Sequence, residues 1–355
     1  MEVGVPGTQR ALHDSRIERI QALASPQDLM DEHPLTDAIA EQVLGQREEV
    51  TRVLDRADPR LMVIVGPCSV HDPKAALDYA QRLAALAPEL EDLLIVMRVY
   101  FEKPRTTTGW KGLINDPSLD DSGDVNKGMR MARELLLDVL ELGLPVGTEF
   151  LDPITPQYIA DTVSWGAIGA RTTESQTHRQ LASGLSMPIG FKNRTDGNVA
   201  VAVDALRAAA AQHSFSGVEL GGGSALLTTT GNADCHVILR GGSQPNHDPG
   251  SVSDVIDRLR SVELPERVII DASHGNSGKD HHRQPHVAEE IGRQVADGNG
   301  SIVGVMLESF LVGGNQPIGP DLTYGQSITD KCMDWEATVE VLRGLDGDAR
   351  TRRSR

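Results

Sequence analysis

Eight short apolar runs in this chain each end at a residue whose side chain can do chemistry. The residues at these ends are Cys68, Arg98, Glu149, Arg171, Lys192, Arg240, His274 and Glu308. Runs of this length and composition are typical of parallel strands that are buried on both faces. When such strands close into a ring, catalytic groups gather at their carboxyl ends. We therefore expect the eight side chains to build a single site.

Six cationic side chains lie at these strand ends or just beyond them. They are Arg98, Lys103, Arg105, Arg171, Lys192 and Arg240. A charge inside a buried run would be costly, so a charge at its end is expected to face the site. Any single arginine is equally well explained by a helix end or a surface ion pair. The set together predicts a ligand with several negative charges, because these side chains pair with phosphate and carboxylate groups.

A second group of residues has side chains that bind metal ions. Cys68 follows the first run, His274 follows the seventh, and Glu308 ends the eighth. The eighth and first strands of a closed ring are neighbours, and Asp330 could fold back toward them. Sulfur, nitrogen and oxygen donors together suit Mn²⁺, Fe²⁺, Co²⁺ or Zn²⁺, with a position open for substrate. The alternative is a buried cysteine that only fills space.

Glu149 is a carboxylate among the cations. It either holds a neighbouring arginine or lysine in place or transfers a proton. We favour the holding role, because charged partners commonly orient the groups that contact a ligand.

Strands and helices must alternate to position these residues. Between residues 61 and 308 the apolar runs alternate with amphipathic stretches such as 74–85, 129–142 and 287–296. This pattern is typical of the α/β class and predicts a (β/α)₈ TIM barrel, which needs about 250 residues. We assign the catalytic barrel to residues 59–345.

Other segments are expected to extend this barrel. Residues 1–58 form an N-terminal extension with helical stripes at 17–24 and 38–54, to which we assign oligomerisation or regulation. Alternating residues and three glycines predict an inserted β-hairpin at 216–231, before the sixth strand. The last segment, 346–355, is expected to be a flexible tail.

Composition limits the possible partners. The 355 residues carry a net charge of −17, which argues against nucleic acid and acidic membrane surfaces as partners. No apolar run approaches the roughly 20 residues that span a bilayer. The N-terminus lacks a secretory pattern, and three distant cysteines do not form a disulfide framework. We therefore expect a cytoplasmic protein.

Seven blocks of sequence resemble one enzyme family. They are VGPCSVHD, MRVYFEKPRTTTGWKG, PVGTEFLDPITPQY, WGAIGARTTESQTHRQLASGLSMPIGFKN, CHVILRGG, IDASHGNSGK and SITDKC. Their order and content resemble the type I 3-deoxy-7-phosphoheptulonate synthases (DAHP synthases), over roughly residues 14–345. These transferases condense phosphoenolpyruvate with erythrose 4-phosphate and water, giving DAHP and phosphate. That reaction opens the shikimate pathway of aromatic amino-acid biosynthesis.

The resemblance implies a role for each matching residue. The implied metal ligands are Cys68, His274, Glu308 and Asp330. The implied phosphoenolpyruvate site comprises Arg98, Lys103, Glu149, Arg171, Lys192 and Arg240. The implied erythrose 4-phosphate site comprises Lys103, Pro104, Arg105, Thr106 and Asp330. We take Lys103, Cys68 and His274 as catalytic, with Lys103 as a hypothetical proton donor.

The resemblance also implies feedback control by an aromatic amino acid. The matching effector positions are Asp14, Gln157, Leu185, Ser186, Phe215, Gly217 and Leu227. Glycine at 217 favours tyrosine as the inhibitor, because the absence of a side chain leaves room for a phenolic hydroxyl. The alternative is a hairpin that only covers the barrel or forms a subunit contact. A homodimer or homotetramer is expected, as is usual in the family.

Two other functions remain as alternatives. A related synthase uses arabinose 5-phosphate, but its aldose loop differs from Lys103-Pro104-Arg105-Thr106-Thr107. A catalytically silent amino-acid sensor is disfavoured, because every expected site residue is present. Cys332, two residues after Asp330, either approaches Cys68 and pairs with it on oxidation or is an inert buried thiol.

Overall fold

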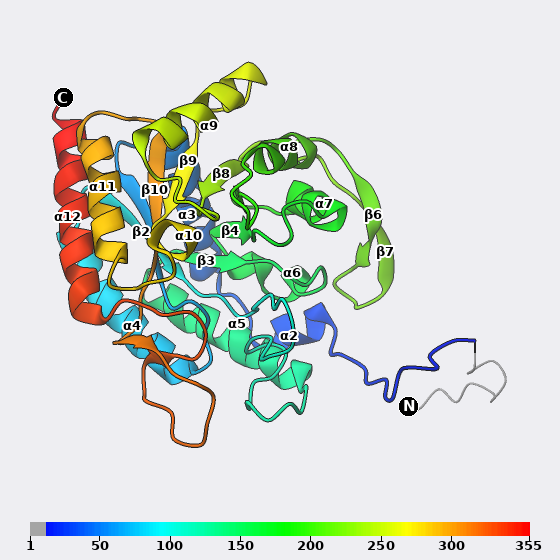
Figure 1. Ribbon diagram of the computed structural model, residues 1–355. Coiled ribbons are helices and arrows are strands. Elements are labelled where there is room, and N and C mark those ends of the chain that lie inside the picture. Colours follow the sequence, from blue (N-terminus) through cyan, green and yellow to red (C-terminus); the bar gives the residue numbers. More distant parts are fainter. Residues whose placement is uncertain (1–11) are drawn as a thin grey trace.

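The computed structural model describes residues 12–355, and its centre is a closed barrel of eight parallel strands (Figure 1). Around the barrel the strands follow the order β1-β10-β9-β8-β5-β4-β3-β2. Their bounds are β1 Leu61–Gly66, β2 Leu93–Arg98, β3 Val146–Glu149, β4 Trp165–Ile168, β5 Ile189–Lys192, β8 His236–Leu239, β9 Val268–Asp271 and β10 Ile302–Glu308. The predicted (β/α)₈ barrel is confirmed.

Each strand buries both of its faces, which explains its continuous apolar run. On β1, Leu61, Val63 and Val65 join the large core between strands and helices. Met62 and Ile64 point the other way and belong to the smaller cluster that fills the barrel. This alternation follows from the two-residue period of a strand. A charged side chain therefore fits only where a strand ends.

Helices follow the strands and cover the barrel from outside (Figure 1). Their bounds are α4 Pro73–Leu86, α5 Val125–Glu141, α6 Pro156–Ile159, α7 Gln176–Gly184, α8 Ala200–Ala209, α9 Pro249–Ser261, α10 His274–Ser277, α11 Gln284–Ala296 and α12 Trp335–Arg353. Short 3₁₀ turns, η1 Ala87–Glu89 and η2 Ala160–Thr162, follow α4 and α6. Among residues 12–355, none of the helices has both the length and the apolar character to cross a membrane.

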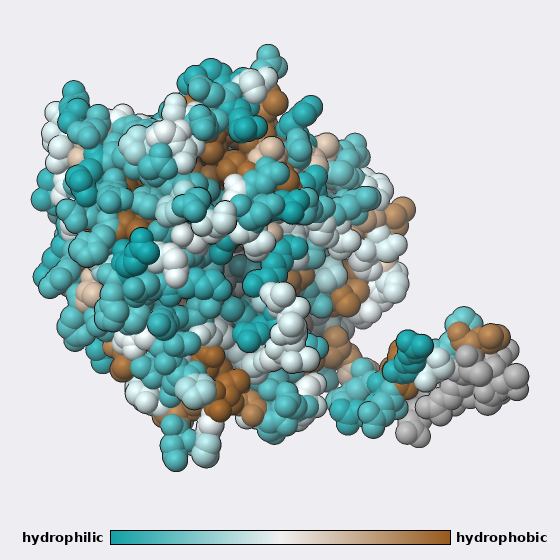
Figure 2. Space-filling model, in the orientation of Figure 1, coloured by the Kyte–Doolittle hydropathy of each residue, from teal (hydrophilic) through white to brown (hydrophobic). Residues whose placement is uncertain are grey.

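The N-terminal extension contains α2 Pro26–Glu32 and α3 Asp37–Leu54, and the second agrees with the helical stripe predicted at 38–54. The helix predicted at 17–24 is wrong, because this segment forms neither helix nor strand. Its apolar side chains remain in solvent, with Ile20 76% exposed, so nothing stabilises a helix by covering its apolar face. Figures 1 and 2 show this segment running away from the barrel with apolar side chains along it.

The carboxyl-terminal segment also differs from the expected flexible tail. Helix α12 continues to Arg353, and Ala349 is fully buried. Arg352 donates hydrogen bonds to the carbonyl oxygens of Ile302 and Pro59. Arginines in the last turn also favour the helix end electrostatically. These contacts order a segment that composition alone assigned to solvent.

Two small sheets lie outside the barrel. The predicted hairpin is present as β6 Ser214–Val218 and β7 Ser224–Thr228, two residues earlier than expected at its start. After the barrel closes, β11 Val312–Asn315 pairs with β12 Gln326–Ser327. Backbone bridges then join Gly314 to Cys332 and Ser309 to Met333. This return brings the residues between β12 and α12 back to the barrel mouth, as expected for Asp330.

Candidate active site

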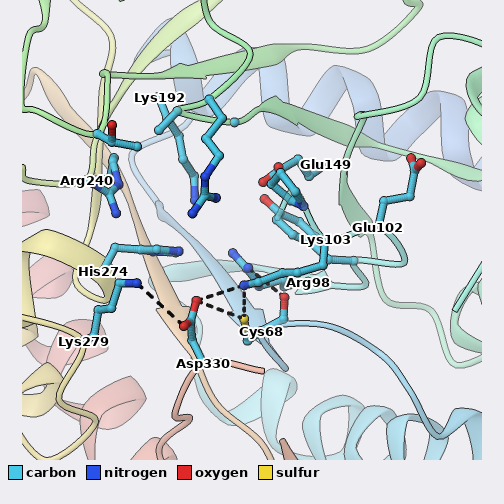
Figure 3. A pocket seen from close by; sticks show the side chains of 16 residues that line it. Cys68, Arg98, Glu102, Lys103, Glu149, Lys192, Arg240, His274, Lys279 and Asp330 are labelled. Atoms are coloured by element: carbon cyan, nitrogen blue, oxygen red, sulfur yellow. Dashed lines mark hydrogen bonds and ion pairs between the residues drawn. The ribbon is translucent and has the colours of Figure 1, made fainter. Parts of the chain in front are cut away.

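The carboxyl ends of the strands surround one cavity of about 50 Å³ (Figure 3). Its lining residues are Cys68, Arg98, Tyr100, Glu102, Lys103, Pro104, Glu149, Gly169, Ala170, Arg171, Lys192, Thr195, Arg240, His274, Lys279 and Asp330. A wider cleft of about 900 Å³ shares Arg171, Arg240 and His274 with this cavity and adds Thr106. The structure therefore brings seven of the eight strand-end residues to one cavity, and the eighth, Glu308, contacts that group directly.

Three expected metal ligands meet at one point beside this cavity. The ligand atoms of Cys68, Glu308 and Asp330 all lie within 4.8 Å of one another. His274 is slightly apart, with its Nε2 3.6 Å from Glu308 Oε1. Its Nδ1 lies 2.8 Å from Asp271 Oδ2, a contact that fixes the imidazole orientation. A thiol, two carboxylates and an imidazole form a donor set that fits a borderline divalent cation.

Lys103 joins this donor set to the rest of the cavity. Its Nζ lies 2.8 Å from Cys68 Sγ and 2.9 Å from Asp330 Oδ2 (Figure 3). The lysine thus places a positive charge against two of the expected metal ligands. It reaches them from the loop that follows β2, immediately before Pro104.

Arg98 is held tightly by the protein itself. The fully buried guanidinium donates through Nε and Nη2 to the carbonyl oxygens of Pro67 and Cys68. Nη2 also donates to Glu308 at 3.1 Å. These bonds leave few donors for a ligand, so Arg98 also fixes the position of the segment that carries Cys68.

Lys192 at the end of β5 and Asp271 at the end of β9 form a buried ion pair at 3.0 Å, across the end of the intervening strand β8. Burial alone would raise the pKa of Asp271, but Lys192 and His274 outweigh it and hold this pKa well below its usual range. The carboxylate therefore links a predicted phosphoenolpyruvate ligand to a predicted metal ligand.

Two arginines of the cavity have no carboxylate partner within residues 12–355. The Arg171 side chain makes no hydrogen bond or ion pair there, and the Arg240 guanidinium donates only to the carbonyl oxygen of Gly241. Burial is the largest influence on the pKa of Arg240, and it lowers this pKa. Both guanidinium groups can therefore bind an anion without first breaking an ion pair.

Glu149 lies at the end of β3 and is 8% exposed. A methyl group on Gly169 would come within 2.5 Å of its Oε1, so glycine is needed for the carboxylate to sit there. In the aldose loop, Pro104 lines the inner cavity and Thr106 the outer cleft. Arg105 is exposed, lies against Gly109 and lines neither space.

The expected effector residues lie on adjoining elements outside the cavity. Gln157 is on α6, Leu185 and Ser186 follow α7, and Phe215 pairs with Leu227 across the hairpin. The N-terminal segment joins these elements, because Ala24 accepts a hydrogen bond from Tyr158 of α6.

Asp14 and Gly217 have surroundings that bear on the expected effector site. Asp14 is exposed and has a φ of +56°, before the N-terminal segment reaches α6. A methyl group on Gly217 would lie 2.5 Å from Leu227 Cδ1. The space expected beside this glycine is therefore occupied by Leu227.

Sequence reasoning missed three residues of the site. Asp271 was hidden inside an apolar run, although a charge that ends a strand was the signal used elsewhere.

Glu102 accepts hydrogen bonds from the backbone N–H groups of Leu151 and Asp152. Burial, reinforced by Asp152 and Glu149, raises the pKa of Glu102 to about 7. Tyr100 is the third missed residue. It was overlooked because it is an uncharged aromatic residue in a block of sequence that is rich in charged residues.

Cys332 lies beside Cys68, which agrees with one of the two alternatives that the sequence left open. The Cys68 backbone N–H donates to Cys332 Sγ at 3.3 Å, and both thiols are free. Burial raises the pKa of both thiols.

Comparison with known proteins gives a consistent result. Residues 39–343 match the model of the DAHP synthetase I family. The phospho-2-dehydro-3-deoxyheptonate aldolase of Corynebacterium glutamicum is 54% identical, covering 96% of this chain and 95% of its own. The Phe-sensitive aldolase of Escherichia coli K12 is also 54% identical, covering 96% of this chain and 98% of its own.

The solved structures agree with these sequence matches. The structure of the aldolase from Francisella tularensis has a TM-score of 0.93 at 50% identity and covers 95% of this chain and 99% of its own. Relatives named Phe-, Trp- and Tyr-sensitive are all between 50% and 54% identical to this chain, so overall identity does not distinguish the effector. The chain belongs to the DAHP synthetase I family.

Proposed function

We propose that this protein is a metal-dependent 3-deoxy-7-phosphoheptulonate synthase. It condenses phosphoenolpyruvate with erythrose 4-phosphate and water, and releases DAHP and phosphate. One observation carries the proposal. Arg171 and Arg240, which have no carboxylate partner among residues 12–355, share a cavity with Cys68 and Asp330 of the donor set, and Lys103 contacts both of those ligands. A dianionic enol phosphate and an aldehyde are the reactants that such a two-part site suits.

The cationic side of the cavity receives phosphoenolpyruvate in this proposal. Arg171, Arg240 and Lys192 bind its phosphate and carboxylate, and Arg98 adds positive charge. Cations that are already in position hold two mutually repelling anions together. Little free energy is then needed to rearrange the site during the reaction. Glu149 would orient these cations through its charge in the same cavity, because residues 12–355 give its carboxylate no direct ion pair.

The opposite side receives erythrose 4-phosphate, with Pro104, Arg105, Thr106 and Asp330 as its contacts. Cys68, His274, Glu308 and Asp330 would hold a Mn²⁺, Fe²⁺, Co²⁺ or Zn²⁺ ion. When bound, this ion supplies Lewis-acid polarisation of the aldehyde. Because Arg105 lies outside the cavity, its contact requires the loop to turn inward.

The bond changes then follow from the positions of these residues. The methylene carbon of phosphoenolpyruvate attacks the aldehyde carbon, and Lys103 protonates the new alkoxide from Nζ. Positive character develops at the enol carbon, where water adds and loses a proton. Cleavage of the carbon–oxygen bond to phosphate, with transfer of the hydroxyl proton to the departing phosphate, leaves the ketone of DAHP. Arg171 and Arg240 stabilise this phosphate.

We further propose regulation by tyrosine, which requires the Leu227 side chain to move away from Gly217, together with a homodimer or homotetramer and a cytoplasmic location. The exposed apolar side chains of the N-terminal segment and the hairpin support a subunit contact, with Ile20 76% and Leu226 74% exposed. Three free cysteines suit a reducing compartment.

A substrate-exchange assay tests the proposed reaction. The Mn²⁺-loaded protein should consume phosphoenolpyruvate rapidly with erythrose 4-phosphate and slowly with arabinose 5-phosphate. Titration with tyrosine, phenylalanine and tryptophan then tests the effector. Preference for arabinose 5-phosphate would overturn the proposed substrate, and inhibition by phenylalanine alone would overturn the proposed effector.

A further inference from the structure

Tyr100 has a buried hydroxyl for which residues 12–355 offer no hydrogen-bond partner. The side chain is 2% exposed and lines the inner cavity of the site. Its ring lies under the Arg98 guanidinium, 3.7 Å from carbon to ring centroid. Buried hydroxyl groups are nearly always paired, so an unpaired one that borders a cavity points to a partner inside that cavity.

Tyr79 shows what a structural tyrosine looks like in the same molecule. It is fully buried, and its hydroxyl donates to Ser309 Oγ at 3.0 Å. Other buried hydroxyls without a partner in the described residues belong to Thr173 and Ser277, and neither lines the inner cavity. Among these groups, the missing partner and the cavity coincide at Tyr100.

The surroundings of Tyr100 favour an anion on the cationic side of the cavity. The ring belongs to the apolar cluster that fills the barrel, together with Val96 and Trp165, so it forms the floor of the cavity. Arg98 lies over the ring, and Arg171 and Arg240 line the same cavity. Of the residues proposed to contact erythrose 4-phosphate, Pro104 and Asp330 share the inner cavity, but Thr106 lines only the outer cleft and Arg105 lines neither space. The hydroxyl therefore faces the place proposed for phosphoenolpyruvate and not the aldose phosphate.

We infer that the Tyr100 hydroxyl donates a hydrogen bond to an anionic oxygen of bound phosphoenolpyruvate. This inference rests on the proposed function. The bond gives the floor of the cavity a neutral donor, which adds direction without adding another charge beside Arg98. It also explains why burial of an unpaired hydroxyl is tolerated, since ligand binding satisfies it.

Tyr100→Phe tests this inference, because it keeps the ring under Arg98 and removes only the oxygen. In the Mn²⁺-loaded protein we expect KM for phosphoenolpyruvate to rise about 10- to 100-fold, the range for a hydrogen bond to a charged group. KM for erythrose 4-phosphate should change less than about twofold. The ligand-free Tm should not fall, because no protein hydrogen bond is lost.

Tyr79→Phe is the matched control. It should lower the ligand-free Tm and leave both KM values unchanged, because it breaks a bond to Ser309 outside the cavity. The rise in Tm caused by phosphoenolpyruvate alone is a second readout, and it should shrink in Tyr100→Phe but not in Tyr79→Phe.

The outcomes separate this inference from the proposed function. If the wild-type protein is active and Tyr100→Phe keeps the same KM for phosphoenolpyruvate and the same ligand-induced rise in Tm, the inferred role of Tyr100 is overturned. The proposed function then still stands. A fall in kcat would also overturn it if KM and the phosphoenolpyruvate-induced rise in Tm both stayed unchanged. A wild-type protein that fails to turn over both substrates would overturn the proposed function, while the Tm rise would still report on Tyr100.

Discussion

The rim of the barrel and the hairpin region are built in opposite ways. At the rim, charged side chains contact one another across strands, as in the Lys192–Asp271 pair at 3.0 Å and the Arg98–Glu308 pair at 3.1 Å. On the hairpin, exposed and half-buried residues alternate, and Leu226 is 74% exposed. The rim pairs most of its charges within the chain and, among residues 12–355, leaves Arg171 and the Tyr100 hydroxyl without a partner. The hairpin and the N-terminal segment leave apolar groups in solvent.

This difference indicates which contacts determine the structure of each region. The rim is fixed by contacts within one subunit, so its substitutions should act directly on catalysis. The hairpin presents apolar surface that an effector or a second subunit can cover. Substitutions there should change regulation or assembly and leave the uninhibited reaction almost intact.

The strongest test of this contrast is Lys103→Met. Loss of the ammonium that contacts Cys68 and Asp330 should lower kcat about a thousandfold, within the range for a lost proton donor. Lys279→Met is the control, because this lysine is 59% exposed and lies 4.0 Å from Asp330. Its kcat should fall less than about tenfold. Steady-state phosphoenolpyruvate consumption checks both variants, and near-normal turnover of Lys103→Met would contradict the proposed role.

Metal removal is the next largest expected effect. The donor set around Cys68 predicts that a chelator lowers activity at least about a hundredfold and that Mn²⁺ restores it, since Lewis-acid stabilisation supplies several kcal/mol. The circular dichroism spectrum should not change, because the barrel core does not depend on these donors. Full activity after exhaustive chelation would show that the reaction needs no metal.

The eight strand ends were predictable for a simple physical reason. A fully buried strand excludes charge, so a charge after an apolar run marks the end of the strand, as for Arg98, Glu149 and Lys192. The partners of those charges were not predictable. Whether Arg98 contacts Glu308 or a ligand depends on distances across the barrel, and periodicity carries no such distances.

The same limit explains the wrong helix at 17–24 and the missed end of α12. An apolar stripe shows what a helix could bury, but not whether anything covers it. No other part of the described chain buries Ile20, whereas Ala349 is fully buried. The role of Tyr100 is visible only from a hydroxyl without a partner.

The barrel interior beneath the rim should respond to pH, by a moderate amount. His236 Nε2 accepts a hydrogen bond from Trp165 Nε1 at 3.0 Å, so its proton lies on Nδ1, 3.1 Å from the Asp234 carbonyl oxygen. Burial is the main cause that lowers the pKa of His236 to about 3. The unfolded chain takes up this proton below about pH 6.5 and the folded protein does not. The stabilisation is therefore complete above pH 6.5 and is lost as the pH falls toward 3.

Urea unfolding at pH 7 and pH 5 measures this loss. Linkage gives about 2 kcal/mol for one such histidine over this interval. His236→Gln should reduce the difference between the two pH values by that amount. A variant with the same pH dependence as the wild type would show that the histidine is already protonated in the fold.

The smallest effect on catalysis is expected at the hairpin. Gly217→Ser should weaken inhibition by tyrosine, because a side chain there displaces Leu227 Cδ1, 2.5 Å from the added carbon. Without effector, kcat and KM should change less than about twofold. Leu226→Ser, at an exposed position of the same hairpin, is the control and should retain tyrosine inhibition. A large loss of uninhibited activity in Gly217→Ser would show that the hairpin belongs to the catalytic machinery.

The fate of the bridging oxygen of phosphoenolpyruvate tests most directly whether the rim performs the proposed condensation. The Mn²⁺-loaded protein is given erythrose 4-phosphate and phosphoenolpyruvate carrying ¹⁸O between carbon and phosphorus, and the released phosphate is analysed by mass spectrometry. We expect phosphate release only when both substrates are present, with the label retained in phosphate because the carbon–oxygen bond breaks. Unlabelled phosphate, or release without the aldose, would contradict the proposed reaction.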